Sequence, residues 1–336
     1  MPRLGIAVAG LGRIGRLHAE IIKVWVKDAE LVAVVDVVES LAKSVGESFK
    51  VKWYTDYDKA LQDPRVDAVV IAAPTFLHKD MIVKAAEAGK HVFVEKPLTV
   101  TSKEAEEVRQ AVEKHRVKLQ VGYNRRFDYA YGKARKDIED GVIGKPLAYL
   151  AVARDPDAPP GWVVDPKRSG GIFLDQLSHD FDMARWLMRD EIVEVHVVGG
   201  AYIHESIKEK GDLDVVSIVF KFANGAQGFI HGTRKFPYGY ELRTEVFGDK
   251  GVIYVGTNRD ELYARGTKDG LTYFGAPWFI KRFYDAYVNE LTSFVKAVLE
   301  GKEPECTVVD GLRAVQIAEA CWRSVKEGRP VRVETR

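Results

Sequence analysis

The sequence of 336 residues lacks the features that mark several protein classes. Its two cysteines, Cys306 and Cys321, form neither a C-x-x-C pair nor a Cys/His cluster, so we expect no metal site and no disulfide framework. No apolar run approaches the roughly 18 residues of a membrane span. The formal net charge is +1, with lysine and arginine scattered among acids. We therefore predict neither nucleic acid nor a membrane as a partner.

The remaining composition is that of a globular chain, 46% hydrophobic and 29% charged, and its length suggests two domains. Two thiols without a disulfide framework suit a reducing compartment, and an apolar strand beginning at Leu4 leaves no space for a signal peptide. We therefore expect a cytoplasmic protein. Asparagine and glutamine are scarce, at four and six residues, whereas lysine, arginine and glutamate are plentiful, which favours a thermophilic source.

The most informative segment is Leu4–Asp36. An apolar strand is followed by the complete motif Gly10-x-Gly12-x-x-Gly15, a helical pattern, a second apolar strand and Asp36. Gly10 permits the tight turn, Gly12 lets the backbone approach a pyrophosphate, and Gly15 lets the helix pack close to the sheet. Asp36 is placed to accept hydrogen bonds from an adenosine ribose. This context predicts a dinucleotide site, because a ligand-free turn would need only one of the glycines.

The first third of the chain alternates short apolar strands with helices, which predicts a parallel sheet buried on both faces. The expected strands are Leu4–Ala9, Leu31–Val35, Ala68–Ala73, Val92–Val94 and Leu119–Val121, with helices at Lys79–Ala88 and Ser102–His115.

The pattern after Gly122 is different, because alternating strands there are joined by hairpin signals such as Asn224-Gly225. This predicts an open, mostly antiparallel sheet. The expected strands are Leu147–Ala153, Val193–His204, Asp214–Phe222, Ala226–Arg234, Glu241–Phe247 and Val252–Val255, and the expected helices are Asp128–Asp140, His179–Arg189, Ile280–Leu299 and Val309–Lys326. An open face rich in Val, Ile, Phe and Tyr needs a cover, either the last helices or another subunit. We expect a homo-oligomer, a dimer or tetramer.

A second informative segment is Glu95-Lys96-Pro97, at the carboxyl end of an expected parallel strand. Ligands bind at that edge of such sheets, so Lys96 is expected near the nicotinamide end of a bound dinucleotide. Pro97 ends the strand and holds Lys96 in a turn. The alternative is an ordinary surface lysine beside an acid.

A third segment places Asp175, His179 and Asp182 at i, i+4 and i+7. On one helix these side chains form a single stripe, where two carboxylates can orient an imidazole and increase its basicity. The alternative is a capped helix with a hydrogen-bonded structural histidine.

With these motifs, the chain resembles the Gfo/Idh/MocA family of sugar and cyclitol oxidoreductases along nearly its whole length. The motifs that carry the resemblance are Gly10–Gly15, Glu95-Lys96-Pro97, the Asn-Arg-Arg-Phe-Asp run at 124–128, and Asp175 with His179. Asp155 within Ala153-Arg154-Asp155-Pro156 and the segment Tyr238-Gly239-Tyr240 make it similar to the inositol 2-dehydrogenase branch. Gln176-Leu177-Ser178 departs from the more apolar linker of that branch, which leaves the polyol open.

The resemblance implies a Rossmann domain over residues 1–123, an α+β substrate and oligomerisation domain over 124–336, and NAD as cofactor. It implies catalytic roles for Lys96, Asp175 and His179. Substrate contacts are implied for Arg125, Asp155, Asp182, Tyr238 and Tyr240. Cofactor contacts are implied for Gly10, Gly12, Arg13, Ile14, Gly15, Asp36, Pro74, His78, Glu95 and Lys96.

The implied reaction is oxidation of a secondary hydroxyl of a cyclic polyol, foremost myo-inositol to its 2-keto form. An aldose or another inositol isomer is the alternative substrate, and a non-catalytic NAD-binding regulator is a third reading. The residues suit the reaction: His179 is the expected base, Asp175 orients it, and Lys96 stabilises or relays charge on the reacting oxygen. NAD would accept the hydride.

Overall fold

The computed structural model describes residues 3–159, 161–237, 239–256, 263–268, 270–274 and 278–334. The chain divides into two compact units. The first contains the residues up to Asn124 together with Asp285–Val315, and the second contains Arg125–Tyr284 and Gln316–Arg336. Two segments that the sequence interpretation placed in the second region, Asp285–Glu300 and Val308–Val315, therefore pack with the first unit.

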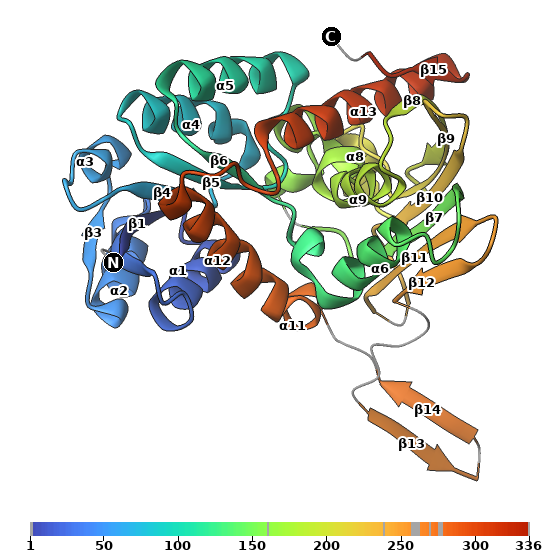
Figure 1. Cartoon of the computed structure of the whole chain (residues 1–336), viewed down its shortest axis with the longest axis horizontal. Helices are drawn as coiled ribbons and strands as arrows, with labels where there is room; N and C mark the ends of the chain where they lie inside the picture. Colours follow the sequence, from blue (N-terminus) through green and yellow to red (C-terminus); the bar gives the residue numbers. More distant parts are fainter. Residues whose placement is uncertain are drawn as a thin grey trace. The chain divides into compact units, whose positions relative to one another are not determined.

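The first unit is built on a six-stranded parallel sheet in the order β3-β2-β1-β4-β5-β6 (Figure 1). Its strands are β1 (Leu4–Ala9), β2 (Ala29–Val35), β3 (Lys52–Tyr54), β4 (Ala68–Ile71), β5 (His91–Glu95) and β6 (Leu119–Gly122). This is the strand order of a dinucleotide-binding fold, in which the strand order reverses between β1 and β4. The predicted Rossmann class is confirmed, and β3 is a short edge strand that the apolar pattern missed.

Helices connect these strands. They are α1 (Arg13–Val24), α2 (Glu39–Phe49), α3 (Tyr57–Leu61), η1 (Thr75–Leu77), α4 (His78–Glu87), α5 (Ser102–His115) and α12 (Tyr284–Glu300), with the first part of α13 (Val308–Glu327). The start of α5 shows why the sequence folds this way. The Thr101 side chain accepts from the Glu104 amide, and the Glu104 carboxylate accepts from the Thr101 amide, so two otherwise unpaired donors are satisfied.

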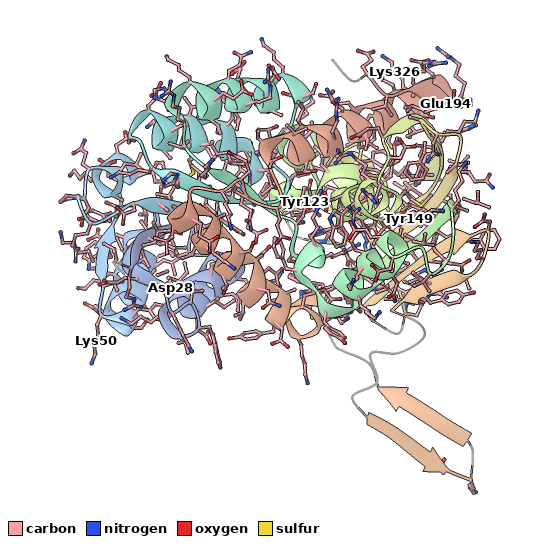
Figure 2. The ribbon with its side chains drawn as sticks, in the orientation of Figure 1. Asp28, Lys50, Tyr123, Tyr149, Glu194 and Lys326 are labelled. Atoms are coloured by element: carbon pink, nitrogen blue, oxygen red, sulfur yellow. The ribbon has the colours of Figure 1, made fainter. Side chains whose placement is uncertain are left out.

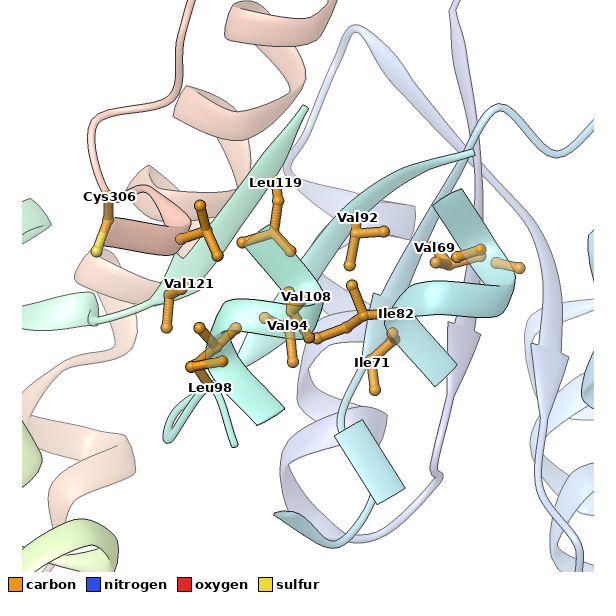
Figure 3. Packing of buried hydrophobic residues seen from close by; sticks show 14 of the residues in the cluster. Val69, Ile71, Ile82, Val92, Val94, Leu98, Val108, Leu119, Val121 and Cys306 are labelled. Carbon is orange, nitrogen blue, oxygen red and sulfur yellow. The ribbon is translucent and has the colours of Figure 1, made fainter. Parts of the chain in front are cut away.

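The apolar core of the first unit lies between the sheet and helices α4 and α5 (Figure 3). Strand residues Val92 and Val94 pack there against Ile82 of α4 and Val108 of α5. All four side chains are 0% exposed. The continuous apolar runs of these strands therefore follow from burial on both faces of the sheet.

The second unit is built on a seven-stranded sheet in the order β12-β11-β7-β10-β9-β8-β15. The strands are β7 (Pro146–Arg154), β8 (Ile192–Gly200), β9 (Val215–Phe222), β10 (Gln227–Thr233), β11 (Glu241–Gly248), β12 (Val252–Val255) and β15 (Val331–Arg332). Neighbours pair antiparallel except β7 with β10, which confirms the predicted, mostly antiparallel sheet. The structure also shows a separate antiparallel pair, β13 (Tyr263–Thr267) and β14 (Gly270–Phe274), that was not predicted.

The helices of the second unit are η2 (Asn124–Phe127), α6 (Tyr129–Glu139), η3 (Gly161–Val164), α7 (Pro166–Ser169), α8 (Gly171–Asp175), α9 (Ser178–Met188), α10 (Glu205–Glu209) and α11 (Phe279–Arg282), together with the later part of α13. Tyr149 of β7 is fully buried, with its hydroxyl 3.5 Å from the Asp180 carbonyl of α9, whereas Lys326 of α13 is exposed (Figure 2). No helix among the described residues is long and apolar enough to cross a membrane.

One predicted strand was too long. The pattern extended it to His204, but β8 ends at Gly200. The Asp214 carboxylate accepts backbone N–H groups of Tyr202, Ile203 and His204 at 2.8–2.9 Å. These bonds replace ladder hydrogen bonds and turn the chain away from the sheet, because a buried side chain offers the backbone an alternative acceptor.

Candidate active site

The glycine-rich loop between β1 and α1 has the geometry that a dinucleotide needs. Gly10 has φ +88°, and a Cβ on Gly15 would lie 1.7 Å from the Gly10 carbonyl oxygen. The fold itself therefore requires both glycines, not only one as the sequence suggested. Gly12 is exposed, and a Cβ there would meet no described protein atom within 4 Å. Packing therefore gives no reason for Gly12, whereas a pyrophosphate approaching the backbone does. Arg13 and Ile14 follow it in the first turn of α1.

Asp36 lies beside this loop, immediately after β2. Its Oδ2 accepts from the Leu11 amide at 2.8 Å, and its Oδ1 accepts from the Val38 amide at 2.9 Å. The carboxylate is therefore held at the loop before any ligand arrives, and its free lone pairs can accept ribose hydroxyls. The loop and Asp36 together fit NAD.

His78 and Pro74 occupy the segment that follows β4. The His78 ring is buried, with Nδ1 2.9 Å from the Pro97 carbonyl and Nε2 2.8 Å from the Ala73 carbonyl. Burial lowers the pKa of His78. The ring therefore ties two loops together, and a cofactor contact by His78 or by half-buried Pro74 stays a prediction.

Lys96 immediately follows the last residue of β5. The Glu95 carboxylate accepts from His18 Nε2 at 2.7 Å and from the Lys96 amide at 3.2 Å. The Lys96–Pro97 peptide is cis, Lys96 is half-buried and Pro97 is buried. Lys96 thus stands at the carboxyl edge of the parallel sheet, as predicted, on a turn that hydrogen bonds hold in place.

In the second unit, the structure corrects the single helical stripe predicted for Asp175, His179 and Asp182. Helix α8 ends at Asp175 and α9 begins at Ser178. Gln176 interrupts the helix because its side-chain amide donates to the carbonyls of Ala153 and Thr233, at the ends of β7 and β10. Asp175 and His179, both half-buried, therefore lie on consecutive short helices.

A buried arginine that the sequence reasoning missed fixes Asp175. The Arg234 side chain is 0% exposed and donates from Nη1 to Asp175 Oδ2 at 3.2 Å. Its Nη2 lies 3.2 Å from Oδ2 of Asp212, which is also fully buried. Burial raises the pKa of Asp212, and the Arg234 charge opposes that shift. Arg234 thus orients Asp175, and it also offsets the negative charge that the sequence suggested for the surroundings of His179.

Two of the predicted substrate residues are in buried ion pairs. Arg125 donates to Asp180 at 2.8 Å, and Asp182 accepts two bonds from Arg126, at 2.9 and 2.5 Å. All four side chains are at most 6% exposed. The sequence analysis predicted Arg125 and Asp182 as site residues but not their partners. The partner of Arg125 is Asp180, and the partner of Asp182 is Arg126. A substrate role for Arg125 or Asp182 would be additional to these pairs, and it stays a prediction.

Tyr240 and Asp155 are closer to the predicted arrangement. Burial raises the pKa of the Tyr240 hydroxyl, the Arg125 charge opposes the shift, and the Asp155 charge adds to it. Arg125 and Asp155, two predicted substrate residues, therefore lie close enough to Tyr240 to influence the pKa of its hydroxyl. The Tyr240 ring packs 6.2 Å from that of Trp278. Tyr238 lies outside the described residues.

Comparison with known families decides what this arrangement belongs to. Residues 4–123 match the model of the oxidoreductase family with an NAD-binding Rossmann fold, and residues 131–254 match the GFO/IDH/MocA C-terminal domain. The chain belongs to the Gfo/Idh/MocA oxidoreductase family. The predicted family, enzyme class and NAD cofactor are thereby confirmed.

Relatives in this family match over nearly their full length. The chain is 39% identical to the scyllo-inositol 2-dehydrogenase (NAD(+)) of Bacillus subtilis, over 98% of this chain and 96% of that protein. It is 40% identical to the myo-inositol 2-dehydrogenase of Thermotoga maritima, over 98% of both chains. The crystal structure of Lactobacillus casei scyllo-inositol dehydrogenase with bound NAD(H) and scyllo-inositol is 28% identical, with a TM-score of 0.92, and the match covers 99% of this chain and 100% of that chain.

Proposed function

We propose that this Gfo/Idh/MocA protein oxidises a secondary hydroxyl of a cyclic polyol with NAD, and that its substrate is myo-inositol, converted to the 2-keto-inositol. The observation that carries the proposal is the full-length match to two relatives named as inositol 2-dehydrogenases at 39% and 40% identity. The glycine loop and Asp36 support the cofactor part of the proposal, and Asp175, His179, Asp155 and Tyr240 support the polyol part.

Each residue has a defined task in this reaction. NAD supplies the hydride acceptor. His179 takes the hydroxyl proton, since an imidazole titrates close to neutral pH. Asp175, itself held by Arg234, orients the imidazole. The Lys96 ammonium stabilises negative charge developing on the reacting oxygen. Asp155 and the Tyr240 hydroxyl supply the directional hydrogen bonds that select one hydroxyl of a polyol.

The relative named for scyllo-inositol keeps a second candidate substrate open. Steady-state rates with NAD and a panel of myo-inositol, scyllo-inositol and aldoses test the proposal. We expect the highest kcat/KM with an inositol. A higher value with an aldose would reject inositol as the substrate, and no turnover with any of them would favour a non-catalytic NAD-binding role.

NAD should be preferred to NADP by at least about 100-fold in kcat/KM, because the fixed Asp36 carboxylate would repel a 2′-phosphate, a like-charge contact that costs several kcal/mol. Asp36→Asn, which removes the charge and keeps the shape, should narrow the ratio of kcat/KM between NAD and NADP, mainly by increasing kcat/KM with NADP. Steady-state kinetics with both cofactors measure this ratio. A wild-type preference for NADP would refute the role of Asp36.

We also infer a homo-oligomer, a dimer or tetramer, assembled through the open face of the seven-stranded sheet. Burial alternates along β7 and β9, so that Leu150 and Val219 lie on the exposed face, 39% and 55% exposed. Phe229 of β10 pairs in register with both, and Phe247 and Tyr254 are 47% and 56% exposed. An apolar face of this extent is typical of a surface covered by a second copy.

Val219→Asp should therefore shift the protein to a smaller species in size-exclusion chromatography with light scattering, since a desolvated carboxylate opposes association. Val24→Asp is the control, because Val24 ends α1, is 61% exposed and is not part of this sheet. A monomeric wild type would exclude the proposed assembly.

We also infer that the protein is cytoplasmic and that its source is thermophilic. Both cysteines are buried free thiols, which suits a reducing compartment. Helix α6 and its C-cap carry three i, i+4 ion pairs, the kind of surface ion pairing that favours stability at high temperature. The pairs are Lys133–Asp137, Arg135–Glu139 and Lys136–Asp140.

A further inference from the structure

Three ionisable side chains meet inside the first unit: His18 of α1, Glu95 at the end of β5, and Glu290 of α12. One nitrogen or oxygen of each lies within 4.8 Å of the others. His18 and Glu290 are 0% exposed, and the Glu95 side chain is 12% exposed. The reaction proposed above uses neither His18 nor Glu290, and no local sequence motif joins the three.

Glu290 is the unusual member of this trio. Neither of its carboxyl oxygens has a hydrogen-bond partner among the described residues. The Gln120 side chain donates to the backbone carbonyl of Glu290 at 2.9 Å and so fixes the helix without neutralising the carboxyl. Burial raises the pKa of Glu290 well above its usual range, and the negative charge of Glu95 adds to the shift. Two carboxylates this close in a buried place cannot both ionise without a large cost.

His18 supplies the donor that holds the second carboxyl. Its Nε2 is 2.7 Å from Glu95 Oε1, while Nδ1 is buried with no hydrogen-bond partner among the described residues. A neutral ring with its proton on Nε2 satisfies this geometry, because it leaves only a lone pair unpaired, whereas an imidazolium would leave an N–H unpaired. Phe93 and Tyr287 pack edge-on against the ring at 5.3 and 5.8 Å and fix its plane.

We propose that Glu290 stores a proton at neutral pH, so that Glu95 remains the one carboxylate of the trio. Glu95 is then free to accept from His18 with one oxygen and from the Lys96 amide with the other. Glu290 and His18 are thus positioning residues, which act through Glu95 on the turn that carries Lys96. Only this last step, the effect on Lys96, rests on the proposed function.

A divalent cation between the three groups is the competing possibility. The 2.7 Å separation of His18 Nε2 and Glu95 Oε1 is a hydrogen-bond length, and it favours a shared proton over a cation between these atoms. A cation would require Glu290 to be ionised, and the two possibilities therefore predict opposite results for Glu290→Gln.

The test compares the unfolding of wild type and Glu290→Gln in denaturant across pH 5–9. A carboxyl whose pKa is raised in the folded state stabilises the fold below its unfolded pKa, and this contribution is lost as pH rises toward the folded pKa. The unfolding equilibrium constant of wild type should therefore grow relative to Glu290→Gln by up to about tenfold per pH unit. A ratio that does not change with pH would overturn the proposal. The proposal would also be overturned if EDTA destabilised the wild type and the Glu290→Gln variant were less stable than the wild type.

Glu300→Gln is the matched control on the same helix, because Glu300 is exposed and ionised in both states, and its ratio should stay flat across this pH range. Should Glu290→Gln fail to fold, infrared spectra of the wild type at neutral pH decide instead. They should contain the band of a protonated carboxyl group, and its absence would overturn the proposal.

The effect on Lys96 is tested by inositol oxidation. Glu290→Gln, which keeps an uncharged polar side chain of the same shape, should retain a kcat several-fold above that of Glu290→Leu. Similarly, the kcat of His18→Gln, which keeps a donor near the position of Nε2, should exceed that of His18→Leu. The loss should appear in kcat and not in the KM for NAD. Equal kcat within each pair would remove the positioning role. A wild type that oxidises no polyol would instead reject the proposed function, and the unfolding result would stand.

Discussion

Lys96→Ala is expected to lower kcat for polyol oxidation by roughly 10² to 10⁴, the usual range for a group that assists proton transfer or charge stabilisation. NAD binding should survive, because the glycine loop after β1 and the Asp36 carboxylate after β2 are unchanged in this variant. Steady-state kinetics and calorimetric titration with NAD separate the two effects.

Lys103→Ala is the control for this variant, since Lys103 is an exposed lysine in the first turn of α5. It should leave both kcat and NAD affinity unchanged. A near-native kcat in Lys96→Ala would make Lys96 an ordinary surface lysine. The hydrogen bond from the Lys96 amide to Glu95 would then have no catalytic role.

His179→Ala is expected to reduce kcat/KM by a similar factor and to change its pH dependence. In wild type, oxidation should increase through the range in which an imidazole loses its proton, around pH 6.5, because only the neutral ring can accept the hydroxyl proton. The variant should be slow and should lose this acid limb. Profiles of kcat/KM against pH for both proteins measure it.

Asp175→Asn is the matched variant, because it keeps the shape of the side chain that Arg234 holds and removes its charge. This variant should keep the acid limb of the pH profile but shift it to lower pH, because the Asp175 carboxylate no longer favours the protonated ring of His179. If His179→Ala is slow but keeps the wild-type limb, the base is Lys96 and His179 only positions the substrate. Coupling between these groups would then assign the measured pKa values to the set rather than to one residue.

The parts of the fold that local pattern determines were predictable from the sequence. Strands β1, β6 and β12 follow from short apolar runs, and α5 follows from the Thr101–Glu104 capping pair. The glycine loop was predictable because Gly10 and Gly15 are required by the fold itself, and Gly12 is explained by a ligand that approaches the backbone.

The pairings inside the site were not predictable, because they join residues that are far apart in the chain. Arg234 and Asp175 are separated by 59 positions, and Arg126 and Asp182 by 56. No periodicity encodes such pairs, so the sequence suggested two free carboxylates beside His179 where the structure shows two that are bound to arginines. The break between α8 and α9 has the same origin, since Gln176 bonds to two distant strand ends.

In the proposed reaction, hydride passes from a ring carbon of inositol to NAD on this protein. The most direct measurement uses myo-inositol with deuterium on C2, purified wild-type protein and NAD, followed by mass spectrometry of the reduced cofactor. The NADH formed should carry the deuterium, and Lys96→Ala should form it far more slowly. Unlabelled NADH, or no NADH with either myo-inositol or scyllo-inositol, would refute this hydride transfer.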